Sequence, residues 1–243
     1  MKLLLVGTLV LGMMPWAKAF AGDFNDTEKE RYYQVVLIWV KDPDKFQKYG
    51  ELLGPIVSKY RGAGERIITP VSTFFAGSKA DQMEAPHMIN IVYYDSKEAY
   101  ERFERDPDFL KIKHLREESI EMAGIGGEVL GGTLQSGAVS DRLYMIEFAY
   151  YADESGKAFE QYEKKTARYY QRHKLMKERV LNPDDVFGGI AMPDLVTIKY
   201  LEDEKDRSAM ESDAEHATVE KLYGESIRDL IWIEGKAAFV NMD

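Results

Sequence analysis

Long apolar runs along the chain predict its strands. Tyr32–Val40 is an unbroken series of aromatic, β-branched and aliphatic residues between two charged ones, which is typical of a buried strand. One more strand is predicted to begin near Glu128. The remaining runs that predict strands are Glu65–Ala76, Met88–Tyr94, Leu143–Tyr151, Met176–Leu181, Leu195–Leu201 and Ile231–Glu234.

Apolar residues at helical spacing lie between these strands. Asp42 and Pro43 supply an N-cap and a proline at the first helical position, which predicts a helix from there to about Tyr60, with Gly54-Pro55 as a kink point. The other predicted helices are Ser96–Arg105, residues 106–122, Glu154–His173, Asp203–Glu211 and Asp213–Asp229. Each half of the chain therefore has the order β-α-β-β-α-β.

The two halves also share sequence. Phe46-Gln47-Lys48-Tyr49 recurs as Phe159-Glu160-Gln161-Tyr162, and Glu65–Pro70 recurs at the same offset as Glu178–Pro183. Later matches, such as Glu118-Ser119-Ile120 with Glu225-Ser226-Ile227, keep a second constant offset. Because one insertion in the first copy explains the change of offset, the pattern predicts duplication of a single fold.

The element order implies a ferredoxin-like sandwich, in which helices cover one face of a four-stranded antiparallel sheet. The other face is apolar and needs a cover. A second copy in the same chain can provide that cover, sheet against sheet.

Three stretches resemble a known family: the strand and helix that end at Tyr49, residues 92–109 (VYYDSKEAYERFERDPDF), and the helix after them. They resemble the dimeric α/β-barrel superfamily and, within it, a small uncharacterised family, a domain of unknown function. The resemblance implies that two ferredoxin-like units close into one barrel. The expected fold class is therefore α+β, with two tandem ferredoxin-like β-α-β-β-α-β repeats forming an intramolecular pseudo-dimeric α/β barrel.

The N-terminus has the pattern of an export signal. Lys2 is followed by an apolar run over Leu3–Met14, and Ala17-Lys18-Ala19 is a small-x-small cleavage pattern, so 1–19 is predicted to be a signal peptide cleaved near Ala19. The apolar run is shorter than the roughly 20 residues that span a bilayer. An uncleaved anchor or a buried N-terminal helix is the alternative.

The rest of the chain divides at changes of composition. The predicted units are a flexible lead-in over 20–30, a first repeat over 31–132, a Gly- and Ser-rich linker over 133–140 and a second repeat over 141–243. The chain has no cysteine. An exported chain without cysteine fits a bacterial periplasmic or secreted protein better than a disulfide-stapled eukaryotic one.

Charge and composition exclude several classes of function. The 243 residues include 42 Asp and Glu against 32 Lys and Arg, a net charge of −10, which argues against nucleic acid or anionic lipid as the main partner. The absence of cysteine excludes thiolate metal sites and a cysteine nucleophile. The four histidines are dispersed, and none recurs between the copies as a haem ligand would. No metal and no tightly bound cofactor are therefore expected.

The candidate chemistry lies on the predicted strands. Alternation places Glu147 and Lys199 on mixed faces, which we expect to point into the barrel, whereas their counterparts Val36 and Val92 are apolar. Glu147 would be a general base, with Lys199 stabilising negative charge; a structural ion pair is the alternative. The predicted ligand-binding residues are Gln34, Trp39, Asn90, Arg179 and Tyr200.

Two functions remain open from the sequence. The first is binding or transformation of a small molecule, either aromatic or of another kind, in a pocket of one or both copies. As an enzyme, the resemblance implies a cofactor-independent monooxygenase, isomerase or lyase type. The second is a non-catalytic periplasmic interaction protein. In either case we expect a monomer or homodimer, no nucleic acid, and no stable membrane insertion after signal cleavage.

Overall fold

The computed structural model describes residues 31–77, 83–132 and 142–240, which contain eight strands and six helices. We call 31–132 the N-terminal half and 142–240 the C-terminal half. The elements of the N-terminal half are β1 (Tyr32–Val40), α2 (Pro43–Lys59), β2 (Ala63–Ala76), β3 (Met88–Tyr94), α3 (Lys97–Glu104), α4 (Pro107–Ser119) and β4 (Ile120–Gly131). Those of the C-terminal half are β5 (Leu143–Tyr151), α5 (Lys157–Arg172), β6 (Met176–Phe187), β7 (Leu195–Leu201), α6 (Glu204–Glu211), α7 (His216–Ser226) and β8 (Ile227–Val240).

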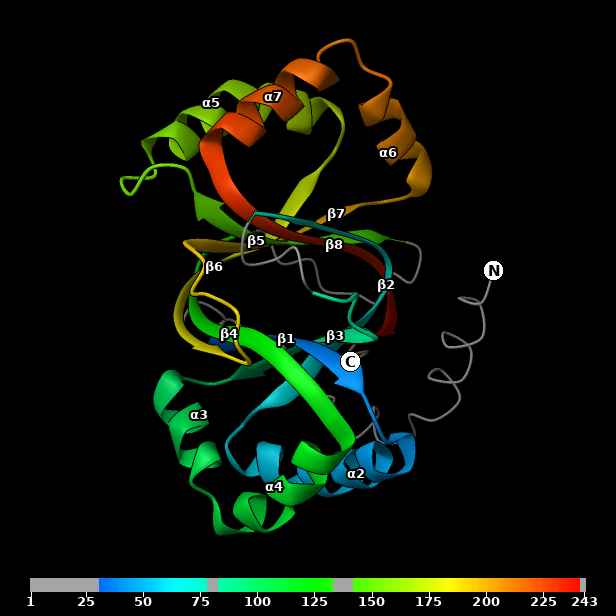
Figure 1. The fold of residues 1–243 in the computed structure, drawn as a ribbon, viewed down its shortest axis with the longest axis vertical. Helices are drawn as coiled ribbons and strands as arrows, with labels where there is room; N and C mark the ends of the chain where they lie inside the picture. The colour runs from blue at the N-terminus through cyan, green and yellow to red at the C-terminus, as the bar shows by residue number, and fades with distance from the viewer. Residues whose placement is uncertain (1–30, 78–82, 133–141, 241–243) are drawn as a thin grey trace.

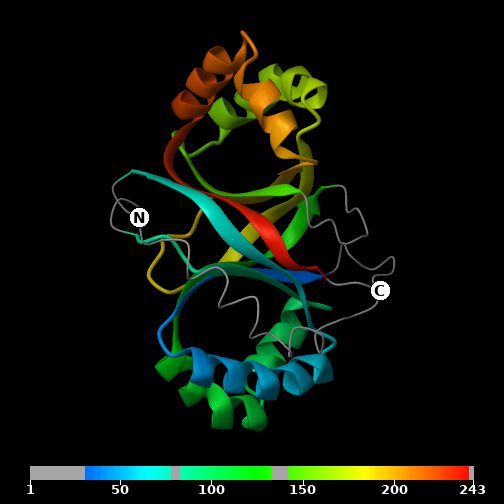
Figure 2. The same cartoon turned by 90° about the vertical axis from the view of Figure 1, so that its right-hand side faces the viewer.

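The strands form one closed antiparallel barrel in the order β1-β3-β2-β8-β5-β7-β6-β4. Helices α2, α3 and α4 lie at one end of the molecule and α5, α6 and α7 at the other, with the barrel between them (Figure 1). The halves are joined by two ladders, β2 with β8 and β4 with β6. The long β2 and β8 strands lie side by side in Figure 2. The expected α+β class and barrel are therefore confirmed.

Helices α2, α3, α4 and α6 begin where the sequence predicts, whereas α5 and α7 begin later than predicted, at Lys157 and His216. The Asp42 side chain accepts a hydrogen bond from the Lys45 amide, Pro43 occupies the first turn of α2, and Pro55 lies inside that helix. Among the described residues, no helix combines the length and the apolar composition needed to cross a membrane. The predicted signal peptide over 1–19, the lead-in over 20–30 and the linker over 133–140 lie outside the described residues.

The barrel interior is apolar and draws on both halves. Residues of β1 such as Val35 and Leu37 belong to the same buried cluster as Ile146 and Phe148 of β5 and Ile198 of β7. The apolar strand faces therefore point into the barrel and the mixed faces point towards the helices, so our prediction of the reverse was wrong. Because eight strands enclose the barrel completely, an unpaired polar side chain in its interior would be cut off from water. Beneath the helices, polar side chains can find partners at the edges of the helix layer.

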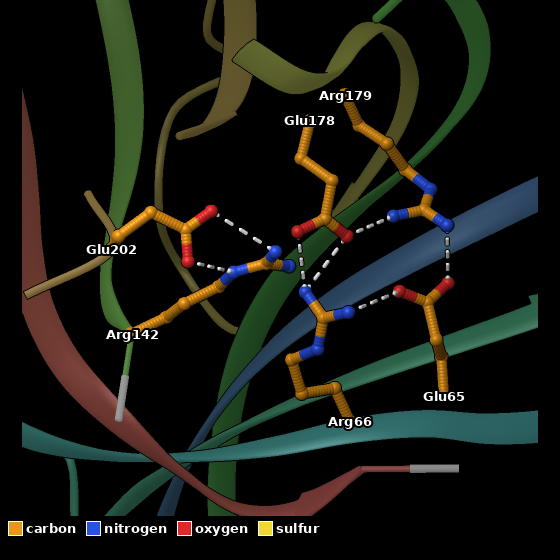
Figure 3. Close-up of polar contacts among 6 residues, drawn as sticks. All are labelled: Glu65, Arg66, Arg142, Glu178, Arg179 and Glu202. Carbon is orange, nitrogen blue, oxygen red and sulfur yellow. Dashed lines mark hydrogen bonds and ion pairs between the residues drawn. The ribbon is translucent and has the colours of Figure 1, made fainter. Parts of the chain in front are cut away.

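Four charged residues interrupt this apolar interior. A bulge at Glu65 on β2 and another at Glu178 on β6 break the alternation, so that each Glu and the following Arg66 or Arg179 is buried. Figure 3 shows the closed ring that they form. Arg66 Nη1 donates to both Glu178 carboxylate oxygens at 2.7 Å, and Arg179 Nη2 lies 2.8 Å from Glu65 Oε2.

The ring stays ionised because its charges are matched. Burial alone would raise the pKa of the Glu178 carboxyl, but the Arg66 and Arg179 guanidiniums hold that pKa below its usual value. Arg179 Nη1 also donates to Glu178 Oε1 at 2.6 Å, and Arg66 Nη2 lies 3.6 Å from Glu65 Oε1. Each carboxylate thus contacts both arginines.

Three strands are longer than predicted. β4 begins at Ile120 where a helix to residue 122 was expected, β6 continues to Phe187, and β8 extends over Ile227–Val240. Much of the added length pairs with the other half through the β4–β6 and β2–β8 ladders, whereas residues 120–123 pair with β1 of their own half. Pairing across the halves overrides the weak local pattern of these segments.

Candidate functional site

A cavity of about 310 Å³ lies between the sheet of the N-terminal half and its helices. This volume is at the lower end of the roughly 300–1,000 Å³ found for small-molecule sites. Most of the lining is apolar or aromatic, including Phe46, Phe103 and Phe187. The polar side chains in the lining are Gln34, Tyr49, Asn90, Tyr94, Tyr100, Glu104, Arg116 and Asp185.

Strand alternation places the floor of the cavity on the helix side of β1 and β3. Gln34 pairs with Val92 and Val36 pairs with Asn90 in the antiparallel ladder, and all four residues line the cavity. Two amide side chains therefore lie among branched apolar ones. This is the pattern of a small-molecule pocket, in which a few polar groups orient an otherwise apolar ligand.

Tyr49, Tyr100 and Arg116 on the helices form part of the opposite wall, and Tyr94 lies at the end of β3. Burial raises the pKa of Tyr49 on α2 to about 12, and it also raises the pKa values of Tyr94 and Tyr100 above their usual range. These phenols are therefore protonated at neutral pH and can donate hydrogen bonds. Arg116 on α4 also lines the cavity, and its guanidinium lies 5.3 Å from the Phe109 ring centroid.

The C-terminal half completes the cavity through β6. Phe187 pairs with Gly124 of β4, and Asp185 pairs with Gly126. A Cβ atom on Gly124 would lie 2.3 Å from the Val35 carbonyl oxygen and 3.0 Å from Phe187 Cζ. Glycine at this position therefore lets the Phe187 ring approach the sheet closely.

Larger side chains stand at the matching positions of the C-terminal half. Val36 pairs with Gly124 on the neighbouring strand, and at the same register of the other half Glu147 pairs with Trp232. Likewise Val92 pairs with Gln34, and Lys199 pairs with Met145. Glutamate, lysine and tryptophan thus stand where the N-terminal half has valine, valine and glycine.

Glu147 and Lys199 are buried and paired with each other. Lys199 Nζ donates to Glu147 Oε2 at 2.5 Å, the Tyr223 hydroxyl of α7 donates to Glu147 Oε1, and the Lys199 ammonium lies 5.4 Å from the Trp232 ring centroid. The structure brings this predicted pair together, but beneath the helices and outside the barrel interior. Their catalytic role stays a prediction.

The five predicted ligand-binding residues do not gather at one place. Gln34 and Asn90 line the cavity, whereas Arg179 belongs to the buried ring. The Trp39 indole donates to the Glu84 carbonyl oxygen at 3.1 Å. The Arg142 guanidinium lies over the Tyr200 ring, 4.1 Å from the centroid of that ring. These last two side chains pack with the barrel core.

Sequence reasoning missed six polar groups of the cavity, which are Tyr49, Tyr94, Tyr100, Glu104, Arg116 and Asp185. Tyr49 had a signal, because it ends the motif that recurs at Tyr162. Arg116 and Asp185 had none, since α4 shows no clear apolar stripe and Asp185 lies in the segment of β6 beyond the predicted strand. Within the described ranges, no group of three His, Asp or Glu side chains is arranged to hold a metal ion.

Comparisons with known proteins agree with this fold. Residues 31–125 match a family described as a domain of unknown function (DUF1330). The structure resembles an anthrone oxidase-like protein with a TM-score of 0.55 and 13% identity, covering 90% of this chain and 98% of that one. No protein with a curated description matches the sequence.

Two further solved structures show the same architecture. A protein of Fusobacterium nucleatum assigned as a monooxygenase has a TM-score of 0.51 and 13% identity, covering 87% of this chain and 94% of its own. A chlorite dismutase variant from Candidatus Nitrospira defluvii has a TM-score of 0.53 and 10% identity, with coverages of 88% and 96%. The resemblance predicted from the sequence is confirmed: residues 31–125 match the DUF1330 family, and the described chain has the fold of the dimeric α/β-barrel superfamily.

Proposed function

We propose that the cavity of the N-terminal half binds a small, flat, largely apolar molecule that carries oxygen substituents. The observation that carries this proposal is the contrast between the halves, since Val36, Val92 and Gly124 leave space where Glu147, Lys199 and Trp232 fill it. Aromatic walls suit a planar ring system, and each buried aromatic contact contributes to affinity.

The polar groups define what the ligand would present. The protonated Tyr49 and Tyr94 hydroxyls and the Arg116 guanidinium can donate to a carbonyl, carboxylate or phenolate oxygen. Such donors stabilise negative charge that develops on an oxygen during a reaction. The relatives named as anthrone oxidase-like and as a monooxygenase support transformation of the bound molecule in addition to binding.

We also propose how the chain is organised and where the protein acts. The sheet orders β4-β1-β3-β2 and β8-β5-β7-β6 support two tandem ferredoxin-like repeats. The predicted signal peptide over 1–19 supports export to the periplasm or beyond. We propose that the mature protein acts there as a monomer or homodimer.

Filling the cavity tests the proposal. A planar probe such as 2-naphthol is titrated calorimetrically into the full chain and into the Val36→Glu/Val92→Lys variant, which carries the residue pair of the other half. We expect the variant to lose probe binding, because the charged pair occupies the ligand volume. The matched control, Glu147→Gln/Lys199→Met, alters only the filled half and should bind as the parent chain does.

A second variant tests whether a loss of probe binding is caused by misfolding. Val92→Phe fills the cavity with a single apolar side chain, and its thermal unfolding can be compared with that of the parent. Undiminished 2-naphthol binding by a folded Val92→Phe variant would contradict the proposed site.

A further inference from the structure

We infer that the C-terminal half sets the specificity of this cavity, with Asp185 accepting a hydrogen bond from a hydroxyl group of the ligand. The inference rests on the proposed function, since it concerns the same cavity. It makes the site a joint product of both halves: one half supplies the sheet and helices, and the other supplies the group that selects the ligand.

The β4–β6 ladder brings Asp185 to the cavity. In this ladder Asp185 lies opposite Gly126, and Phe187 lies opposite Gly124. The two pairs are two residues apart on each strand, so the side chains of Asp185 and Phe187 are both on the helix side of the sheet. A Cβ atom on Gly126 would lie 2.1 Å from the Tyr32 hydroxyl. Small residues on β4 thus make room for side chains from β1 and β6.

Asp185 differs from its neighbour in having an unused acceptor. Asp184 accepts from the Tyr32 hydroxyl at 2.8 Å and from Lys97 Nζ at 2.5 Å. Among the described residues, none donates a hydrogen bond to the Asp185 side chain or forms an ion pair with it, although that side chain is partly buried and lines the cavity. A carboxylate in mostly apolar surroundings is stabilised by any donor that a ligand brings.

A hydroxyl suits this position better than an ammonium group. Burial and the charges of Glu104 and Asp185 raise the pKa of Tyr100. Asp185 and Tyr100 both line the cavity. A ligand hydroxyl between them can donate to Asp185 and accept from protonated Tyr100, whereas an ammonium group can only donate. The lining also holds one guanidinium, Arg116, and a second carboxylate, Glu104, so the Tyr100 donor and not the charge of the cavity favours the hydroxyl.

The other half offers a matched pair without a cavity. On β2, Ser72 lies opposite Glu234 and Phe74 lies opposite Trp232, at the registers of Asp185 and Phe187. The Trp232 indole stands where the N-terminal half has Gly124, and the Phe74 side chain is 56% exposed. Ser72 and Phe74 are therefore natural control positions.

The experiment compares matched probes on the full chain. Dissociation constants are measured calorimetrically for 2-naphthol, for 2-methoxynaphthalene, which lacks the donor, and for 2-naphthylmethylammonium. We expect 2-naphthol to bind roughly tenfold or more tightly than the methyl ether, the range for a hydrogen bond to a charged group. Asp185→Ala should abolish the preference for 2-naphthol and leave the affinity for the methyl ether unchanged. The control Ser72→Ala should keep the preference for 2-naphthol.

Phe187 provides an independent measurement. Phe187→Ala should weaken both neutral probes, whereas Phe74→Ala should weaken neither. If Asp185→Ala lowers thermal stability, Asp185→Asn keeps the shape of the side chain and should reduce the preference for 2-naphthol in the same direction.

The outcomes separate this inference from the proposed function. Three results would overturn the role of Asp185 while leaving the cavity as a binding site. The parent chain could bind the two neutral probes equally well, or it could bind the ammonium probe most tightly. Alternatively, Asp185→Ala could weaken the binding of both neutral probes by the same factor. Binding that Val92→Phe does not diminish would instead contradict the proposed function itself.

Discussion

Arg66 of β2 donates to both carboxylate oxygens of Glu178 of β6 across the barrel interior, at 2.7 Å to each. The two residues come from different halves, and Glu65 and Arg179 close the ring around them. All four side chains are at most 4% exposed. The charged centre of the barrel therefore links the halves and depends on both.

Breaking this ring should destabilise the fold strongly. Arg66→Met leaves Glu178 with one fewer partner in the apolar interior, and we expect a loss of about 3–5 kcal/mol of unfolding free energy in urea denaturation. Arg61→Ala, which removes an exposed ion pair with Asp95, is the control and should cost less than about 1 kcal/mol. Similar losses for the two variants would show that the ring contributes no more than a surface pair.

We expect the Trp232 side chain to fill the space between the sheet and the helices of the C-terminal half. Trp232→Ala should cost about 3–5 kcal/mol in unfolding free energy, because a large side chain beneath the helices is removed and leaves a void. Added indole should then raise the melting temperature of this variant but not of the parent chain, since only the variant has the vacated volume. A variant that loses no stability, or that indole leaves unchanged, would contradict this packing role.

Asp213 should make stability depend on acid pH. The Glu215 amide donates to Asp213 Oδ1 at 2.8 Å and His173 Nε2 lies 2.8 Å from Oδ2, and these contacts lower the pKa of Asp213 from 3.8 to about 2. A folded-state pKa below the unfolded value contributes stability that is present above pH 3.8 and is lost as the pH falls towards 2. Asp213→Asn should therefore lower the melting temperature at pH 7, and the difference from the parent should vanish near pH 2.

Lys177 should have an unusually reactive amine. Burial and the charge of Lys199 lower the pKa of Lys177 to about 8, whereas the ion pair of its ammonium with Glu163 opposes that shift. Acylation followed by mass spectrometry should show Lys177 reacting with a midpoint near pH 8, ahead of other lysines. Lys199→Met should move that midpoint upward because a neighbouring positive charge is removed; an unchanged midpoint would assign the shift to burial alone.

Local pattern alone located much of the secondary structure. Met88–Tyr94, Leu143–Tyr151 and Leu195–Leu201 were predicted with the bounds that the structure has, because each is a continuous run of strand-forming residues that pairs within its own half. β4 and β8 were predicted far too short. Much of their added length pairs with the other half, which no local pattern reports, and the rest pairs with β1 or β5 of the same half.

The candidate site divides in the same way. Gln34 and Asn90 could be selected from the sequence because polar residues within apolar strands are uncommon, and both line the cavity. Asp185 could not, since its position depends on the β4–β6 ladder. Glu147 and Lys199 attracted attention for the same reason as Gln34, but their charges pair with each other and fill the volume that a ligand would need.

The sequence by itself therefore determined the order of elements and the strand faces, because propensity and alternation act over a few residues. Which face points inwards, which half keeps an open cavity and which residues complete it were decided only by the tertiary structure. The physical reason is that closing the barrel joins strands distant in the chain. Enclosure, and with it the burial of Arg66 and the exposure of Phe74, is a property of the closed barrel and of no single segment.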